Sequence, residues 1–283
     1  MFRCSAPIIV YLMIQGAASF IVTMGYYVHE GFHEMAGDNL DQMMAEVLSS
    51  TMDNLAVLSF ISLCVSYIFL IPIFIRMYRK DRRLDEEEGI PSMKKNVPWK
   101  LYGILAAGGM AGCLAGSNMI SMSGLIEVSE GYASTAETLY STGFGVELIA
   151  LGILAPLTEE MLFRGLVYRR FKETSPMIPA MIWASLVFAL LHGNMVQGIY
   201  AFIMGIVFCY VYERYGSMKA PILMHMSANI LSVVASETSI LDFVYQNQMV
   251  FYTVTFICCL IVIGAVYMIE MYVRPITEEE KST

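Results

Sequence analysis

The stretch APLTEEMLFRGL, residues 155–166, places two adjacent glutamates and an arginine inside a long apolar segment. An ionisable side chain at the centre of a membrane span costs about 2.5–3.5 kcal/mol on insertion scales, so such residues usually face the interior of a bundle. If the chain is a membrane protein, the stretch therefore predicts a buried polar site and not a lipid-facing helix.

The composition indicates a membrane protein. Of the 283 residues, 57% are hydrophobic and only 15% are charged. A soluble domain of this composition would have too little polar surface to cover itself. We therefore predict an all-α fold, a polytopic bundle in contact with the lipid bilayer.

Apolar stretches of about 17–25 residues, long enough to cross about 30 Å of hydrocarbon, predict about eight transmembrane helices. They lie near residues 6–28, 55–75, 101–121, 143–165, 177–193, 196–213, 220–235 and 249–271. We divide the chain into three N-terminal spans with their loops (residues 1–140), a core (141–240), and a C-terminal span with a tail (241–283).

The distribution of charge predicts the orientation. If both termini are cytoplasmic, all 17 Lys and Arg residues lie on the cytoplasmic side, and the other side carries acidic residues such as Glu30, Asp38 and Glu46. This bias predicts cytoplasmic termini and a multi-pass protein of a bacterial plasma membrane, with the endoplasmic reticulum as the alternative. The net charge of −8 argues against nucleic acid as a partner.

The first candidate for chemistry is HEGFH, residues 29–33. On a helix, His29 and His33 share a face and can hold zinc while Glu30 activates water. Gly31 weakens helix by about 1 kcal/mol relative to Ala, and the stretch directly follows the first span. We therefore favour a polar juxtamembrane loop, with an outward-facing zinc protease as an alternative.

The second candidate is the opening stretch. Glu160 and Arg164 are four residues apart and share a helix face, with the acid on the favoured N-terminal side. Glu159 points about 100° away around the helix. The spacing predicts that Glu160 and Arg164 form a structural pair, which leaves Glu159 to face a cavity as a general base.

The two remaining histidines also fall in predicted spans. His192 lies in FALLHGN, and His225 lies in MHMSANI, four residues before Asn229 on the same face. Folding the fourth and fifth spans back on each other about a turn near residue 175 places residue 159 opposite residue 192. These residues therefore form a convergent polar set with Glu159.

At these positions the sequence resembles the CAAX protease and bacteriocin-processing family of intramembrane proteases, the type II CAAX prenyl endopeptidases. The family motifs EExxxR, FxxxH and HxxxN occur in order, as Glu159 to Arg164, Phe188 to His192, and His225 to Asn229. The resemblance covers about residues 150–235.

The resemblance implies a helical bundle whose hydrophilic cavity opens toward the cytoplasm and acts on a peptide or lipidated-protein substrate. Glu159 with His192 would activate water for attack on a peptide carbonyl. His225 and Asn229 would stabilise the oxyanion, usually the largest contribution in acyl-transfer catalysis. The structural or substrate-contacting residues would be Glu160, Arg164 and Phe188.

The sequence leaves the cofactor and the class of function open. Glu159, His192 and His225 could give zinc three ligands, with water as the fourth. The same side chains could work without metal, which we favour because the motifs lack the tight ligand spacing of zincins. A non-catalytic membrane scaffold of the same fold is the rival from another class.

Overall fold

The computed structural model describes residues 2–34, 40–90, 97–127 and 129–273, and every regular element within these ranges is helical. The predicted all-α fold is therefore confirmed. The α-helices are α1 (Phe2–Glu34), α2 (Leu40–Asp53), α3 (Leu55–Glu87), α4 (Lys100–Met122), α5 (Glu130–Leu139), α6 (Phe144–Ile149), α7 (Ala155–Glu160), α8 (Arg169–Lys172), α9 (Met177–Leu190), α10 (Met195–Tyr215), α11 (Lys219–Glu237), α12 (Asp242–Gln246) and α13 (Gln248–Tyr272). Two π-helical segments, η1 (Ala150–Leu154) and η2 (Met161–Tyr168), flank α7, and a 3₁₀ turn, η3 (Ser239–Leu241), precedes α12.

Within the described residues, five helices are long and apolar enough to cross a membrane, which makes the chain a multi-pass membrane protein. They are Arg3–Gly31, Leu55–Glu87, Lys100–Met122, Met195–Tyr215 and Gln248–Tyr272. The other three predicted spans are also helical. The first of them is divided into α6, η1, α7 and η2, while α9 has only 14 residues and α11 is more polar. The total of about eight spans stays a prediction.

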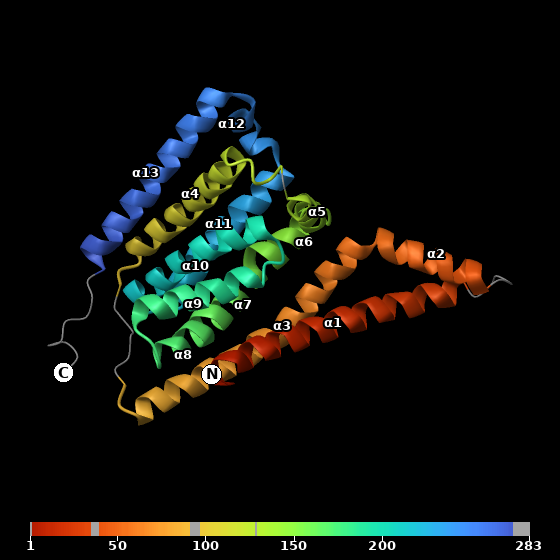
Figure 1. Cartoon of the computed structure of the whole chain (residues 1–283), viewed down its shortest axis with the longest axis horizontal. Helices are drawn as coiled ribbons and strands as arrows, with labels where there is room; N and C mark the ends of the chain where they lie inside the picture. The colour runs from red at the N-terminus through yellow and green to blue at the C-terminus, as the bar shows by residue number, and fades with distance from the viewer. Residues whose placement is uncertain (1, 35–39, 91–96, 128, 274–283) are drawn as a thin grey trace.

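The molecule consists of a bundle and an arm (Figure 1). Helices α1, α2 and α3 form the arm, in which α1 packs along α3 and the far end extends away from the bundle. Both α1 and α3 pack on η2, α3 also packs on α7, and α4 packs between α11 and α13. Large apolar side chains on α1 are exposed, including Met13, Phe20 and Ile21. Such a surface suits a lipid environment.

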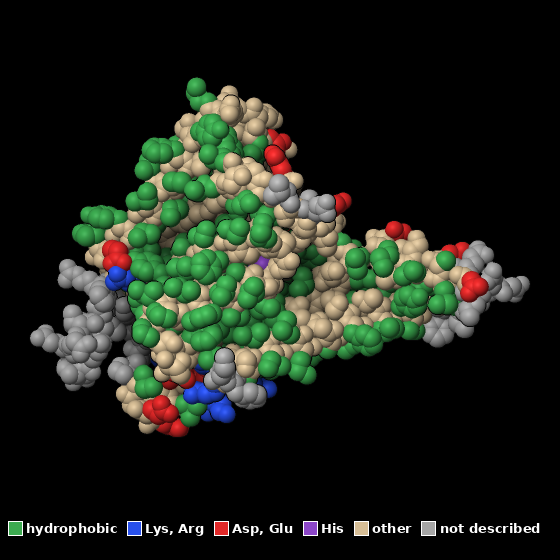
Figure 2. All heavy atoms as spheres, viewed as in Figure 1, with side chains coloured by type: hydrophobic (Ala, Val, Ile, Leu, Met, Phe, Trp, Pro, Cys, Tyr) green, Lys and Arg blue, Asp and Glu red, His purple; other side chains and the backbone are tan. Residues whose placement is uncertain are grey.

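Oppositely charged side chains gather at one end of the molecule. Arg170 donates from Nε to Asp81 Oδ2 over 2.8 Å and from its guanidinium to the carbonyl of Arg3, and Arg3 pairs with Glu173 at 3.1 Å. The start of α1, the end of α3 and α8 therefore meet, as their predicted location on one side of the membrane requires. Lys and Arg side chains gather at the lower left of Figure 2.

The HEGFH stretch is helical, so the loop that we expected at residues 29–33 is wrong. Helix α1 continues through Gly31 to Glu34. A single glycine weakens a helix by only about 1 kcal/mol, and the preceding 29 residues of α1 already supply the nucleus on which further turns add cooperatively. His29 lies on the arm with its side chain 66% exposed, and the side chain of His33 is outside the described part of the structure.

Candidate active site

The glutamates occupy a short α-helical turn between two π-helical segments. Helix α7 begins with Ala155 and Pro156, and the N–H of Ala155 bonds to the carbonyl of Ala150, five residues earlier. In this register the carbonyl of Leu151 would bond to Pro156, which has no N–H. Asn229 supplies the missing donor from α11, with Nδ2 3.0 Å from the oxygen of Leu151. π-Helical turns are rare and occur frequently at functional sites.

Glu160 and Arg164 form the pair that their spacing predicts. Arg164 donates from one guanidinium nitrogen to Glu160 Oε1 at 2.8 Å, and both side chains are at most 1% exposed. A second nitrogen donates to the carbonyl of Gly205 on α10 at 3.0 Å. The guanidinium carbon lies 4.6 Å from the ring centre of Phe188 and 5.0 Å from that of Phe208. The guanidinium of Arg164 is thus enclosed by residues of α7, α9 and α10.

His225 joins the two glutamates. Its Nδ1 lies 2.8 Å from Glu160 Oε1, and its Nε2 lies 3.8 Å from Glu159 Oε2. Because an ionised carboxylate only accepts hydrogen bonds, Nδ1 carries a proton in this contact and Nε2 is directed toward Glu159. The ring of Phe208 stacks on the imidazole at a centroid distance of 4.7 Å. The sequence did not predict that Glu160 binds both Arg164 and His225.

Glu159 faces a cavity of about 400 Å³, and its side chain is 18% exposed. The same cavity is lined by His192, His225 and Asn229. The four side chains belong to α7, to the turn after α9, and to α11. The structure therefore brings together every residue that the sequence proposed for water activation and for oxyanion binding.

His192 lies just beyond the end of α9. Its Nδ1 is 2.8 Å from the carbonyl oxygen of Phe188, and its ring packs edge-on against the Phe188 ring at 4.6 Å. A carbonyl can only accept, so Nδ1 carries the proton and Nε2 keeps its lone pair. The lone pair can take a proton from water or hold it in place.

The three candidate zinc ligands line the cavity without being grouped as a metal site. Within the described residues, no group of three or more His, Cys, Asp and Glu side chains is placed to hold a metal ion. Glu159, His192 and His225 line one cavity but do not form such a group. On the arm, His29 Nδ1 lies 3.6 Å from Glu30 Oε1, in the last turns of α1, whose far end extends away from α7 and α11 (Figure 1).

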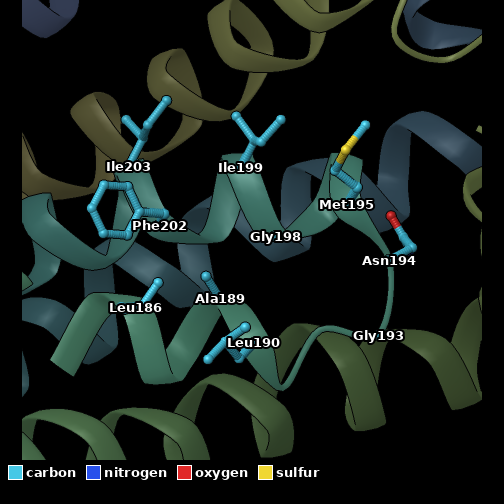
Figure 3. A pocket seen from close by; sticks show the side chains of 10 residues that line it. All are labelled: Leu186, Ala189, Leu190, Gly193, Asn194, Met195, Gly198, Ile199, Phe202 and Ile203. Carbon is cyan, nitrogen blue, oxygen red and sulfur yellow. The ribbon is translucent and has the colours of Figure 1, made fainter. Parts of the chain in front are cut away.

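A second depression, of about 610 Å³, lies between α9 and α10 (Figure 3). Gly193 and Gly198 leave space there, and Leu190, Ile199 and Ile203 give it an apolar lining. Ile199 and Ile203 are partly exposed in the same face. Among the described residues that line it, Asn194 alone has a polar side chain, and such an apolar surface suits contact with lipid.

Comparison with known proteins agrees with this geometry. Residues 141–231 match the family described as Type II CAAX prenyl endopeptidase Rce1-like. The chain is 22% identical over 157 residues to "Putative membrane peptidase YdiL" of Bacillus subtilis (strain 168), a match that covers 56% of this chain and 63% of that relative. No solved structure matches the chain. The resemblance to CAAX prenyl endopeptidases is thus confirmed for the segment that carries the glutamates and histidines, and it supports a membrane peptidase.

Proposed function

We propose that this multi-pass membrane protein is an intramembrane endopeptidase that hydrolyses a peptide bond of a membrane-associated peptide or protein. The observation that carries the proposal is the convergence of Glu159, His192, His225 and Asn229 on one cavity. In addition, the Nδ1 atom of each histidine is engaged, by Glu160 or by the Phe188 carbonyl, so that both Nε2 atoms are left for chemistry.

The reaction begins with a water molecule held between Glu159 and Nε2 of His192. Glu159 takes a proton from the water while the water oxygen bonds to the peptide carbonyl carbon, and the π-electron pair moves to the carbonyl oxygen. When the tetrahedral intermediate collapses, the C–N bond breaks and the proton passes from Glu159 to the leaving amine. General acid–base transfer of this kind contributes about 10²–10⁴-fold to a rate.

The developing oxyanion needs donors that are already in place. Asn229 uses one N–H for the Leu151 carbonyl, and its amide has a second N–H for the substrate oxygen. The carboxylates of Glu159 and Glu160 face one guanidinium and one imidazole. When both nitrogens of His225 carry protons, the charges of Glu159, Glu160, Arg164 and His225 sum to zero. The Nε2–H group of His225 can then donate to the oxyanion, in a site of low dielectric.

Glu160, Arg164 and Phe188 position these groups. Glu160 holds the His225 ring, Arg164 neutralises Glu160, and Phe188 packs on both the guanidinium and the imidazole of His192. We propose chemistry without a metal cofactor, because the donor geometry described above does not form a three-ligand site. The charge bias and the bacterial relative favour a plasma membrane location in a bacterium.

The decisive experiment compares cleavage of membrane peptides by purified wild type, Glu159→Gln and His29→Ala, each with and without a chelator. We expect Glu159→Gln to lose about 10²–10⁴-fold in rate because the base is gone, while its thermal unfolding stays at the wild-type temperature. His29→Ala and the chelated wild type should keep full activity. If His29→Ala were the inactive variant, the chemistry would belong to the arm and the proposal would be wrong.

A further inference from the structure

The cavity extends from the glutamates toward one end of the bundle. Beyond Glu159, polar side chains continue its lining in the direction of α5: Thr135 on α5, Gln197 in the first turn of α10, and Ser232 in the second half of α11. Tyr140 also lines the cavity, and its hydroxyl lies 2.8 Å from Ser232 Oγ. Hydroxyl and amide groups therefore line the path between Glu159 and the α5 end.

In the other direction the cavity meets a packed layer. Along α3, Tyr67 lines the cavity, Phe74 is fully buried, and Asp81 follows in its ion pair with Arg170. Along α10, Phe208 lines the cavity, and the next turn places buried Tyr212 edge-on against Tyr168. The buried layer also contains Leu70, Leu162, Leu166 and Val167. These side chains separate the glutamates from the charged end.

The two ends differ in charge. At the packed end lie the ion pairs of Arg170 with Asp81 and of Lys172 with Glu213, together with the start of α11 at Lys219. At the α5 end, residues 123–143, 191–194 and 238–247 contain no Lys or Arg in the sequence. Figure 2 shows the same separation, with acidic side chains at the tip of the arm and at the top of the view. By the positive-inside rule, the packed end is cytoplasmic.

We infer that the cavity opens on the extracytoplasmic side, so that the substrate is a peptide segment presented from the outer half of the membrane. The inference rests on the proposed function and narrows it. The substrate class becomes exported peptides and outward-facing juxtamembrane segments. A C-terminal tail in the cytoplasm would meet the packed layer of Phe74, Tyr168 and Tyr212 before it reached Glu159. This assignment is opposite to the cytoplasmic opening that the family resemblance implied.

The test is the sidedness of thiol labelling, which needs no catalytic activity. Ser232→Cys places a thiol in the cavity, and Ser217→Cys places the same group in the turn between α10 and α11 at the packed end. Each full-length variant is treated with a small charged methanethiosulfonate in spheroplasts and in inverted membrane vesicles. Mass mapping of the labelled peptides locates the modified residue, so the six native cysteines can stay in place.

We expect Ser232→Cys to be labelled in spheroplasts at least 10-fold faster than in inverted vesicles, and Ser217→Cys to show the reverse preference. Thr135→Cys, on α5, repeats the test if Ser232→Cys fails to accumulate. Labelling of the cavity thiol from the vesicle side alone would overturn the inference, as would labelling of Ser217→Cys from outside. A cavity thiol that reacts only after denaturation would also overturn it, because the cavity would then be closed.

A second experiment separates this inference from the proposed function. Wild-type spheroplasts and inverted vesicles receive the same mixture of membrane-impermeant, quenched peptides. Cleavage in spheroplasts alone supports the proposed substrate class, and cleavage in inverted vesicles alone contradicts it. If the thiols label as expected but neither preparation cleaves, the opening stands and the peptidase proposal is the one that fails.

Discussion

Two helical stretches of this chain, TEEMLFRG at residues 158–165 and HEGFH at residues 29–33, carry acidic side chains beside basic ones, and they differ in what surrounds these side chains. In the bundle, Glu160 and Arg164 are met by His225 from α11 and by the Gly205 carbonyl from α10. On the arm, His29 Nδ1 lies 3.6 Å from Oε1 of Glu30, the next residue in the chain, and the histidine side chain is 66% exposed. In the bundle, the spacing on one helix therefore supplies only part of the site, and the convergence of α10 and α11 on it supplies the rest.

The largest effect should come from breaking the buried pair. Arg164→Met leaves Glu160 and its charge buried without the guanidinium, and removal of one partner of a buried pair destabilises by about 3–5 kcal/mol. Arg214→Met is the matched control, because its partner Glu270 is 43% exposed and surface pairs contribute about 1 kcal/mol or less. Denaturant unfolding in detergent measures the free energy of unfolding of both variants. Equal losses in the two variants would contradict the structural role of Arg164.

The same substitution can be made at one histidine of the bundle and at one histidine of the arm. His192→Gln removes the imidazole that holds the water, and we expect the turnover rate to fall about 10²-fold, the lower end of the range for an acid–base group, since Glu159 is still present. His29→Gln on the arm should leave the rate unchanged. Steady-state kinetics on a cleaved peptide give both values, and equal rates for the two variants would remove His192 from the mechanism.

A smaller effect is expected where α4 approaches the site. A Cβ at Gly109 would overlap the carbonyl oxygen of Met224, the residue before His225, whereas a Cβ at Gly103 meets nothing within 4 Å. Overpacking typically costs about 1–3 kcal/mol. Gly109→Ala should therefore lower the unfolding temperature, while Gly103→Ala leaves it unchanged or raises it slightly. A neutral Gly109→Ala would mean that α4 and α11 are less closely packed.

The smallest effect should be at Gly31, in the middle of HEGFH. A Cβ there meets nothing within 4 Å, and Ala favours helix over Gly by about 1 kcal/mol. We expect Gly31→Ala to raise the helical content or the unfolding temperature slightly and to leave peptidase activity unchanged. A loss of activity in Gly31→Ala comparable to that of His192→Gln would indicate that HEGFH takes part in the reaction.

The contacts within one helix could be predicted from the sequence, and the contacts between helices could not. The pair of Glu160 with Arg164 follows from a four-residue spacing, and the turn between α8 and α9 falls at residues 173–176, where the polar residues indicated it. The bond between Glu160 and His225 joins residues 65 positions apart, so no periodic pattern encodes it.

The π-helical segments and the helical HEGFH were missed for a related reason. Pro156, which has no N–H to donate, leaves a carbonyl beside the glutamates without its helical partner, and the donor that replaces it, Asn229, comes from another helix. At Gly31 the intrinsic preference of one residue was outweighed by the length of α1. Local propensity therefore decides little where a neighbouring element or an existing helix supplies the stabilisation.

The ion cluster of Arg3, Asp81 and Arg170 has a consequence for the order in which the protein is made. Arg170 follows Asp81 by 89 residues and Arg3 by 167. At about 5–20 residues per second of synthesis, Asp81 emerges from the ribosome roughly 4–18 s before its partner. During that interval the contacts that Arg170 makes with Asp81 and with the carbonyl of Arg3 cannot form, so the charged end of the arm docks on α8 only after α8 has been synthesised.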